Sequence, residues 1–316
     1  MLVLSTITPD DAVIMEMEQK FPALEFTYKT KLPVNDDHLK RAEILITYGE
    51  DLTEKHIEAA KQLKWIMVMS AGLEKMPFQE ITRKNIMVTN ARGIHSIPMA
   101  EYTIGMLLQY EKKNKLLLEQ EEKALWERRI MTGELSGKTI LIMGTGAIGG
   151  EIARLAKAFY MKTLGINRGG KQAAYIDELY KNSDLLNVIA RADYITAILP
   201  STPETKGMLG KEHFRKMKET AVFINIGRGD LVEDNILLEA MKNKEIAHSI
   251  LDVFNTEPLP EDHDFWRMDN VTVTPHLSSK SDKYLPRSFD IFEKNLHEYM
   301  GEGKKYINLI DSKKGY

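Results

Sequence analysis

The chain has 316 residues, of which 43% are apolar and 28% are charged, and its formal net charge is −3. This length exceeds what one hydrophobic core usually supports, so we expect two domains. The near-neutral charge gives no electrostatic reason to expect nucleic acid or an anionic membrane as partner, and no apolar stretch is long enough to span a bilayer. Cysteine is absent, which excludes disulfides and suits a reducing cytoplasm, where we expect the protein.

Short apolar runs alternate with amphipathic helical patterns from the start of the chain. The opening MLVLSTITPD lacks the basic segment and cleavage site of a signal peptide and predicts a first strand. Residues 42–49 predict a buried strand, and residues 50–63 predict a helix that opens with Asp51 and Glu54 in capping-box spacing. Further strands are predicted at 64–72 and 85–90. This alternation predicts a parallel sheet covered by helices.

A long helix with a polar face is predicted over about residues 99–126, after which the alternation restarts. The later apolar runs predict six more strands, at 138–144, 161–167, 192–200, 220–227, 249–254 and 270–275, with a helix at 148–159. From Ser281 on, a helix and a tail are predicted. This last segment is too short to fold alone, so we expect it to pack on the N-terminal domain.

The residues Gly144-Thr145-Gly146-Ala147-Ile148-Gly149 match the pattern G-x-G-x-x-G. The pattern follows a predicted strand and opens a predicted helix, which is the context required for dinucleotide binding. Gly144 permits the tight turn, Gly146 permits close approach of a diphosphate, and Gly149 permits close packing of helix on strand. The diphosphate would lie on the helix N-terminus, at Ala147 and Ile148. A glycine-rich turn that binds no ligand remains the alternative.

Three chemically active side chains follow three successive predicted strands. Arg228 follows 220–227, Glu257 follows 249–254, and His276 follows 270–275. In open parallel sheets ligands bind beyond the carboxyl ends of the strands. Reduction of a ketone by hydride transfer requires a proton for the carbonyl oxygen, which His276 could supply while Glu257 holds its tautomer and favours its protonated form. Arg228 could bind a carboxylate or carbonyl in a fork.

Each of these residues also has an ordinary structural explanation when taken singly. Arg228 could be a turn residue beside glycines, and Glu257 could lie in a solvated loop. A lone histidine is usually a surface or capping residue, and we interpret the other seven histidines, such as His38, His56 and His297, in that way. The three residues together, at successive strand ends, favour a catalytic site.

Taken together, the segments GTGAIGG, FINIGRGDLVEDNILLEAM, LDVFNTEPLP and TPHLSS resemble the D-isomer-specific 2-hydroxyacid dehydrogenases over essentially the whole chain. The resemblance implies an α/β fold of two Rossmann-like domains with parallel sheets. A dinucleotide-binding domain, residues 101–281, is expected to be inserted into a discontinuous substrate domain, residues 1–100 and 282–316. The short form of the family suggests glyoxylate or hydroxypyruvate as substrate.

The resemblance also implies roles for individual residues. It implies that Arg228, Glu257 and His276 are catalytic and that Asp252 contacts the nicotinamide carboxamide. The loop SAGLEKMP resembles the loop whose amides hold the substrate carboxylate, which implies Ala71 and Gly72; an ordinary strand–helix connection is the alternative. No metal site is expected. A homodimer formed through the cofactor domain is expected, as is usual in the family.

The cofactor preference depends on the end of the second strand of the cofactor domain. Asn167 and Arg168 lie close to the offset at which an acid would bind the ribose 2′-hydroxyl of NAD. Because Arg168, with Lys171 nearby, could pair with a 2′-phosphate, we predict that NADP(H) is favoured, with NAD(H) possible. A polar turn without a role in cofactor choice remains the alternative.

Two classes of function are compatible with these features. The first is an enzyme that reduces a small 2-oxoacid to the D-2-hydroxyacid with NAD(P)H, and with His276 as general acid and base. The second is a cofactor-sensing binding protein on the same scaffold, similar to the corepressors of this superfamily. The intact set of Arg228, Glu257 and His276 favours the enzyme.

Overall fold

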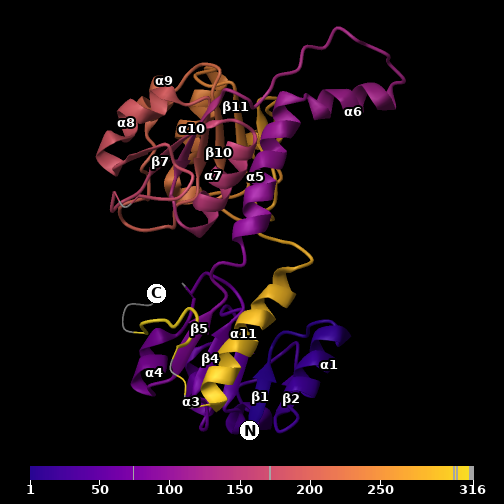
Figure 1. Ribbon diagram of the computed structural model, residues 1–316, viewed down its shortest axis with the longest axis vertical. Coiled ribbons are helices and arrows are strands. Elements are labelled where there is room, and N and C mark those ends of the chain that lie inside the picture. The colour runs from indigo at the N-terminus through magenta and orange to yellow at the C-terminus, as the bar shows by residue number, and fades with distance from the viewer. Residues whose placement is uncertain (74, 171, 302, 304, 313–316) are drawn as a thin grey trace. The chain divides into compact units, whose positions relative to one another are not determined.

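The computed structural model covers residues 1–316 and describes all of them except 74, 171, 302, 304 and 313–316. The chain divides into two compact units. Unit 1 comprises Met1–Ile94 and Ser281–Tyr316, and unit 2 comprises His95–Lys280. Each unit contains one parallel sheet with helices on its two faces (Figure 1). In the described part of the chain, no helix combines the length and apolar character needed to cross a bilayer.

Unit 1 is built on five parallel strands in the order β2-β1-β3-β4-β5. These are β1 (Leu2–Ser5), β2 (Glu25–Tyr28), β3 (Ile44–Thr47), β4 (Trp65–Val68) and β5 (Met87–Asn90). Its helices are α1 (Asp11–Lys20), α2 (Asp37–Arg41), α3 (Glu54–Ala59), α4 (Phe78–Arg83) and α11 (Tyr284–Met300). Strands β3 and β4 are buried at every position, as expected for strands covered on both faces.

The C-terminal helix α11 packs on the sheet of unit 1. Its Phe289, Phe292 and Leu296 are buried in one cluster with residues of α1, β3 and β4. The ring of Phe292 stacks on that of Trp65 with centroids 5.2 Å apart. Figure 1 shows α11 lying across the strands beside α1. The expectation that the C-terminal segment packs on the N-terminal domain is therefore confirmed.

Unit 2 contains seven parallel strands in the order β12-β11-β10-β9-β6-β7-β8. The strands are β6 (Thr139–Met143), β7 (Lys162–Ile166), β8 (Glu178–Tyr180), β9 (Tyr194–Ala197), β10 (Val222–Asn225), β11 (His248–Leu251) and β12 (Val271–Val273). Its helices are α5 (Ser96–Glu111), α6 (Asn114–Glu122), α7 (Ala147–Ala158), α8 (Leu185–Val188), α9 (Lys211–Lys216) and α10 (Asp234–Lys242), with short 3₁₀ turns η1 (Asn182–Asp184), η2 (Ile189–Arg191), η3 (Gly229–Leu231) and η4 (Asp264–Arg267). The strand order reverses between β6 and β9, which is the switch point of a doubly wound fold.

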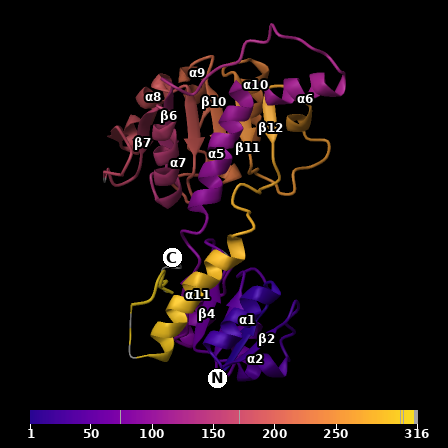
Figure 2. The same cartoon turned by 45° about the vertical axis from the view of Figure 1, so that its right-hand side comes forward.

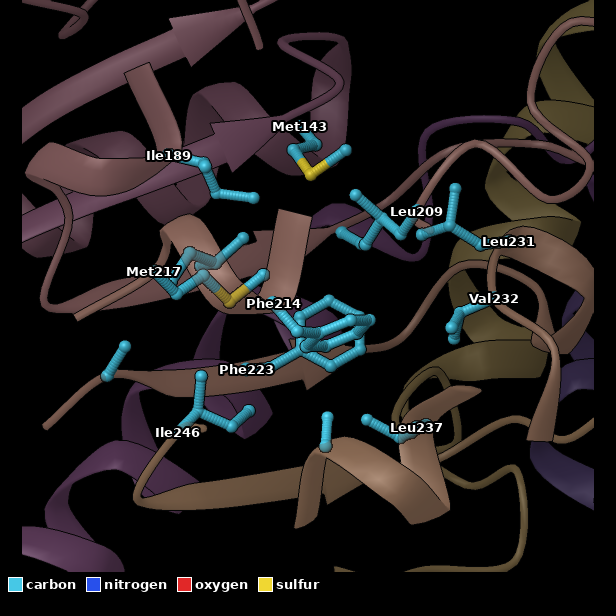
Figure 3. Packing of buried hydrophobic residues seen from close by; sticks show 14 of the residues in the cluster. Met143, Ile189, Leu209, Phe214, Met217, Phe223, Leu231, Val232, Leu237 and Ile246 are labelled. Atoms are coloured by element: carbon cyan, nitrogen blue, oxygen red, sulfur yellow. The ribbon is translucent and has the colours of Figure 1, made fainter. Parts of the chain in front are cut away.

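Buried apolar side chains form one layer on each face of the sheet of unit 2. On one face α5 and α7 pack against each other and on the sheet, as Figure 2 shows. On the other face, residues of α8, α9 and α10 cover the strands, and Phe214 meets Phe223 edge-to-face with centroids 5.7 Å apart (Figure 3). Apolar burial of this kind stabilises a fold by about 25 cal/mol per Å² of surface removed from water. The predicted α/β class with parallel sheets is confirmed.

Two predicted helices differ from the observed ones. The long helix expected over 99–126 is broken at Lys113, whose φ of 57° is left-handed; α5 packs on α7, whereas α6 buries no residue and therefore has no core to continue along. The helix expected over residues 50–63 begins at Glu54. Its cap is Thr53, whose backbone N–H donates to His56 Nδ1 at 3.1 Å, in place of the predicted Asp51.

The first boundary between the units lies earlier than predicted. The sequence assigned residues up to 100 to the substrate domain, whereas the structure places His95–Ala100 in unit 2. The physical reason is that α5 begins at Ser96 and buries Met99 and Ala100 in the layer it shares with α7. The second boundary, at Lys280 and Ser281, is one residue before the predicted one.

Candidate active site

The glycine turn of unit 2 lies at the switch point of the sheet. Gly144 follows β6 with φ of 104°, and a Cβ at this position would lie 2.9 Å from Ile198 O, just past β9. A Cβ on Gly149 would lie only 2.0 Å from Gly144 O, so any side chain there would force α7 away from β6. The turn therefore requires glycine at both positions, as the pattern predicted.

The same turn fits the diphosphate of a dinucleotide. A Cβ on Gly146 would have no atom within 4 Å, so the backbone here borders open space. Gly146 caps α7 without a side-chain hydrogen bond, and the first internal bond of the helix runs from Gly150 N–H to Gly146 O. The N–H groups of Ala147, Ile148 and Gly149 thus have no acceptor within the helix and are placed for an anion.

The predicted cofactor-selecting residues lie beside this turn. The Asn167 amide donates to Thr145 Oγ1 at 2.8 Å, which ties the end of β7 to the glycine turn. Arg168 is exposed. Hydrogen bonds to Thr202 and to its own backbone lower the pKa of Glu204, and the charge of Arg168 adds to this effect. Lys171, the second cation considered from the sequence, lies outside the described residues.

Three adjacent strands bring the predicted catalytic segments to one edge of the sheet. In the parallel register Asn225 of β10 lies opposite Leu251 of β11, and Leu251 lies opposite Val273 of β12. Arg228 and His276 each come three residues after these strand ends. Because neighbouring strands are about 4.8 Å apart, the three connections start side by side.

His276 and Glu257 form a hydrogen-bonded pair. His276 Nδ1 lies 2.8 Å from Glu257 Oε2, and the other carboxylate oxygen accepts from Phe254 N–H at 3.0 Å. The backbone thus fixes the carboxylate, and the carboxylate in turn fixes the imidazole. Nδ1 donates to Glu257, which leaves Nε2 on the side of the ring that faces away from Glu257. The two side chains are 47% and 37% exposed in unit 2, so the pair is accessible to a small molecule.

Arg228 is held against the loop that carries Glu257. A Cβ on the next residue, Gly229, would lie 1.9 Å from the carbonyl carbon of Phe254, so the two connections touch through their backbones. The Asn225 amide donates to Arg228 O at 2.9 Å, and Arg228 Nη1 donates to Gly227 O at 2.8 Å. The structural importance of Gly229 was not predicted, because its contact partner is distant in sequence.

Asp252 is buried beneath the histidine loop. Its carboxylate accepts from Thr274 Oγ1 at 2.6 Å and from the backbone N–H groups of Leu277 and Ser278, each at 2.9 Å. Its own carbonyl accepts from His276 N–H at 2.9 Å. Asp252 therefore anchors the loop that presents His276, a role that the sequence did not predict. Its contact with a nicotinamide carboxamide stays a prediction.

In unit 1 the loop of Ala71 and Gly72 is fixed through its carbonyls. The Asn90 amide donates to Ala71 O at 3.1 Å, and Ser70 Oγ donates to Gly72 O at 2.9 Å. Among the residues that the structure describes, the N–H groups of Ala71 and Gly72 have no acceptor. Two such N–H groups on a fixed loop can bind a carboxylate.

The interpretation of the other seven histidines as surface or capping residues is wrong for His248, which is half-buried at the start of β11. His95 is the N-cap residue of α5 and is buried, and burial lowers the pKa of both histidines. His248 is hydrogen-bonded to Thr272 Oγ1 at 2.8 Å, and its ring packs on that of Tyr110. His248 begins β11, and periodicity alone does not show that a polar residue at a strand start will be covered by a helix.

A glycine turn at a switch point and a histidine–carboxylate pair on the same sheet define unit 2 as a dinucleotide-binding domain of the dehydrogenase class. A family model described as "D-isomer specific 2-hydroxyacid dehydrogenase, NAD binding domain" matches residues 104–278. A glyoxylate reductase of Thermofilum pendens is 33% identical over 260 residues, which cover 80% of this chain and 76% of the relative.

Two further comparisons agree. A D-3-phosphoglycerate dehydrogenase of Methanocaldococcus jannaschii is 33% identical over 250 residues, covering 78% of this chain; the match spans about half (48%) of that relative's length. The crystal structure of a D-isomer-specific 2-hydroxyacid dehydrogenase family protein from Aeromonas salmonicida superimposes with a TM-score of 0.86, at 31% identity over 98% of both chains. The chain belongs to the D-isomer-specific 2-hydroxyacid dehydrogenase family, a family of oxidoreductases, and the predicted family is confirmed.

Proposed function

We propose that the protein reduces a small 2-oxoacid to the D-2-hydroxyacid by hydride transfer from NAD(P)H. The observation that carries this proposal is the hydrogen-bonded pair of His276 and Glu257, beside Arg228 and on the same sheet as the glycine turn. Relatives named glyoxylate reductase support glyoxylate and similarly small oxoacids as substrates.

In this proposal the bound nicotinamide supplies the hydride, and the protein supplies position and a proton. His276 donates the proton from Nε2 to the carbonyl oxygen as that oxygen gains negative charge. Glu257 keeps the Nδ1 proton in place and stabilises the imidazolium before the transfer. Arg228 binds the oxoacid through its guanidinium, which orients the carbonyl carbon and stabilises the charge that develops on oxygen.

The substrate carboxylate is proposed to bind the loop of Ala71 and Gly72. The support is that both N–H groups lack an acceptor among the described residues, while Ser70 and Asn90 hold the loop carbonyls. A carboxylate that accepts two backbone N–H bonds is oriented as well as bound. This would restrict the enzyme to substrates with a carboxylate next to the carbonyl.

The test is a steady-state assay of purified protein over a panel of 2-oxoacids with each cofactor, with His276→Gln as the key variant. His276→Gln should lower kcat by about 10²- to 10⁴-fold, the usual contribution of a general acid. His263→Gln is the matched control, because His263 also faces a carboxylate in unit 2, with Nε2 3.7 Å from Asp234 Oδ2, but is not one of the proposed catalytic residues. Full activity in His276→Gln would contradict the proposed role.

We also propose that NADPH is preferred over NADH. The support is the exposed Arg168 at the end of β7 and the absence of an acid from positions 166–168 in the sequence. Lys181 adds a second cation, since its side chain lies 3.5 Å from where a Cβ on Gly170 would be. Arg168→Ala should lower kcat/KM for NADPH by about 10- to 100-fold, which is the effect expected from the loss of one charge-assisted hydrogen bond. It should leave kcat/KM for NADH unchanged.

Arg154→Ala is the control for this substitution. Arg154 is another exposed arginine of unit 2, but it is paired with Glu151 on α7 at 2.6 Å. Arg154→Ala should leave kcat/KM unchanged for both NADPH and NADH. A clear preference of the unchanged protein for NADH would contradict the assignment to NADPH.

A homodimer formed through unit 2 is the third part of the proposal. Residues 114–132, with α6, project from unit 2 as an arm (Figure 1). The base of the arm is closed by Gly133 N–H, which donates to Glu111 O at 2.9 Å, and by Lys112 Nζ, which donates to Gly133 O at 2.9 Å. On this arm α6 buries no residue, and Trp126 is 91% exposed. Exposed apolar side chains gather on it: Leu116, Leu117, Leu118, Leu125, Trp126 and Met131.

An apolar arm of this kind favours a protein partner, and a second copy of the chain offers the same surface in return. Sedimentation should give a dimer, and Trp126→Glu combined with Leu118→Glu should weaken it. Met15→Glu, which changes an exposed apolar residue of α1, is the control. A monomeric unchanged protein would contradict this part of the proposal without affecting the proposed reaction.

A further inference from the structure

A chain of side-chain hydrogen bonds runs from helix α5 to the loop of His276. The Tyr102 hydroxyl lies 2.7 Å from Thr274 Oγ1, and Thr274 Oγ1 lies 2.6 Å from Asp252 Oδ1. Tyr102 belongs to α5 and is 172 residues from Thr274 in sequence. The chain of bonds therefore joins an element near the start of unit 2 to one near its end.

The direction of these bonds follows from the number of protons available. An ionised carboxylate only accepts, so the single hydroxyl proton of Thr274 points to Asp252. Thr274 Oγ1 then has no proton to offer Tyr102, and the Tyr102 hydroxyl must be the donor. Burial, together with the charge of Asp252, raises the pKa of Tyr102 to about 12, so this donor keeps its proton throughout the range in which enzymes work.

Hydrogen bonds to Asp252 fix the backbone of His276 and of the two residues after it. Its carboxylate holds Leu277 N–H and Ser278 N–H, and its carbonyl holds His276 N–H. His276 itself has a φ of 50°, in the left-handed region, which costs a non-glycine residue about 1 kcal/mol or more and persists only where neighbours hold it. The bonds from Asp252 flank this strained residue directly.

The chain of bonds also lies close in sequence to both connections between the two units. The polypeptide enters unit 2 at His95, seven residues before Tyr102, and leaves it at Lys280, two residues after Ser278. Within unit 2 the bonds thus fix the first turns of α5 relative to the loop that carries His276.

We propose that Tyr102 is a positioning residue for proton transfer, acting through Thr274 and Asp252 on the backbone of His276. It does not touch the reacting atoms. Its hydroxyl holds Thr274, which leaves the Thr274 proton directed at Asp252 and keeps the histidine loop in its strained conformation. This inference rests on the proposed reaction, because it assigns a part in that reaction to a residue outside the catalytic set.

The experiment is steady-state kinetics of Tyr102→Phe with the best 2-oxoacid from the panel. The substitution removes one hydroxyl and leaves the ring in place. We expect kcat to fall about tenfold, the effect of one hydrogen bond, while KM for the oxoacid and for the cofactor stays within about twofold. The solvent deuterium isotope effect on kcat should rise, because proton delivery from a misplaced histidine becomes slower relative to the other steps.

A double-mutant cycle with Thr274→Val separates this role from a general loss of stability. In the background of the Thr274→Val substitution the Tyr102 hydroxyl has no acceptor at this position, so Tyr102→Phe should have no further effect on kcat. Tyr194→Phe is the matched control, since it removes another tyrosine hydroxyl of unit 2, bonded to Glu111 at 2.7 Å. Tyr194→Phe should lower the melting temperature by about as much as Tyr102→Phe does, and it should leave both kcat and the isotope effect unchanged.

The outcomes are distinguishable. Absence of turnover by the unchanged protein would overturn the proposed reaction and the role of Tyr102 with it. Normal turnover by the unchanged protein and by Tyr102→Phe would overturn only the role of Tyr102. Independent effects of Tyr102→Phe and Thr274→Val, with losses that multiply in the double variant, would also overturn it.

Discussion

The substitution Glu257→Gln tests how the histidine is prepared as an acid. In the structure one carboxylate oxygen of Glu257 accepts from His276 Nδ1 and the other accepts from Phe254 N–H. Glutamine has the same shape but only one acceptor oxygen. If that oxygen faces His276, the amide NH₂ opposes Phe254 N–H; if it faces Phe254, the NH₂ opposes Nδ1 and excludes the protonated imidazole.

Either orientation loses one hydrogen bond, and the negative charge is lost in both. A charge-assisted hydrogen bond contributes about 1.5–3 kcal/mol, and the exposure of Glu257, at 37%, places the expected loss near 2 kcal/mol. At about 1.4 kcal/mol for each factor of ten, kcat should fall about 30-fold. KM should change little, because the proposed substrate contacts come from Arg228 and from the loop of Ala71 and Gly72.

The assay is the oxidation of NAD(P)H followed by absorbance, with Glu261→Gln as control. Glu261 lies four residues further along the same connection and is exposed, so its neutralisation changes the local charge equally without touching His276. An unchanged kcat in Glu257→Gln, or an equal loss in Glu261→Gln, would refute the idea that the pair acts as one acid.

Two further substitutions test the glycine turn and the half-buried His248. Gly149→Ala should abolish cofactor binding and lower the melting temperature, because its Cβ would lie 2.0 Å from Gly144 O, whereas Gly150→Ala on the same helix should be tolerated; equal behaviour of the two in calorimetry would contradict this. Burial, aided by neighbouring lysines, lowers the pKa of His248 to about 4 from 6.5, so between these values the unfolded chain binds a proton that the folded chain does not. The free energy of unfolding should therefore drop by up to about 3 kcal/mol as the pH falls through this window. His248→Gln should flatten that dependence in urea titrations at pH 7 and pH 5, and an unaltered dependence would show that other groups cause it.

The sequence predicted the parts of the site that depend on local order along the chain. The turn from Gly144 to Gly149 is recognisable because a strand precedes it and a helix follows. The sequence indicated Arg228, Glu257 and His276 as candidates because each comes after an apolar strand, and parallel strands end at one edge of the sheet. The structure places the connections that carry them at that edge, and their catalytic roles stay a prediction. The alternation of strand and helix indicated the α/β class for the same reason.

The remaining features depend on contacts between residues far apart in sequence. The bond between Tyr102 and Thr274 joins positions 172 residues apart, and the backbone contact of Gly229 with Phe254 links two separate connections. The break at Lys113 has no glycine or proline to mark it and follows from the loss of a packing surface for the helix. Periodicity within a segment carries no information on such contacts, so the anchoring role of Asp252 became visible only in the structure.

The proposed reaction is decided by incubating the purified protein with NADPH and glyoxylate, hydroxypyruvate or a larger 2-oxoacid, and by analysing the product on a chiral phase wherever the product is chiral. We predict oxidation of NADPH in a 1:1 ratio with formation of the 2-hydroxyacid, in the D configuration, and loss of both in His276→Gln. Cofactor binding without turnover of any oxoacid would contradict this prediction and would favour a cofactor-sensing binding protein built on the same fold.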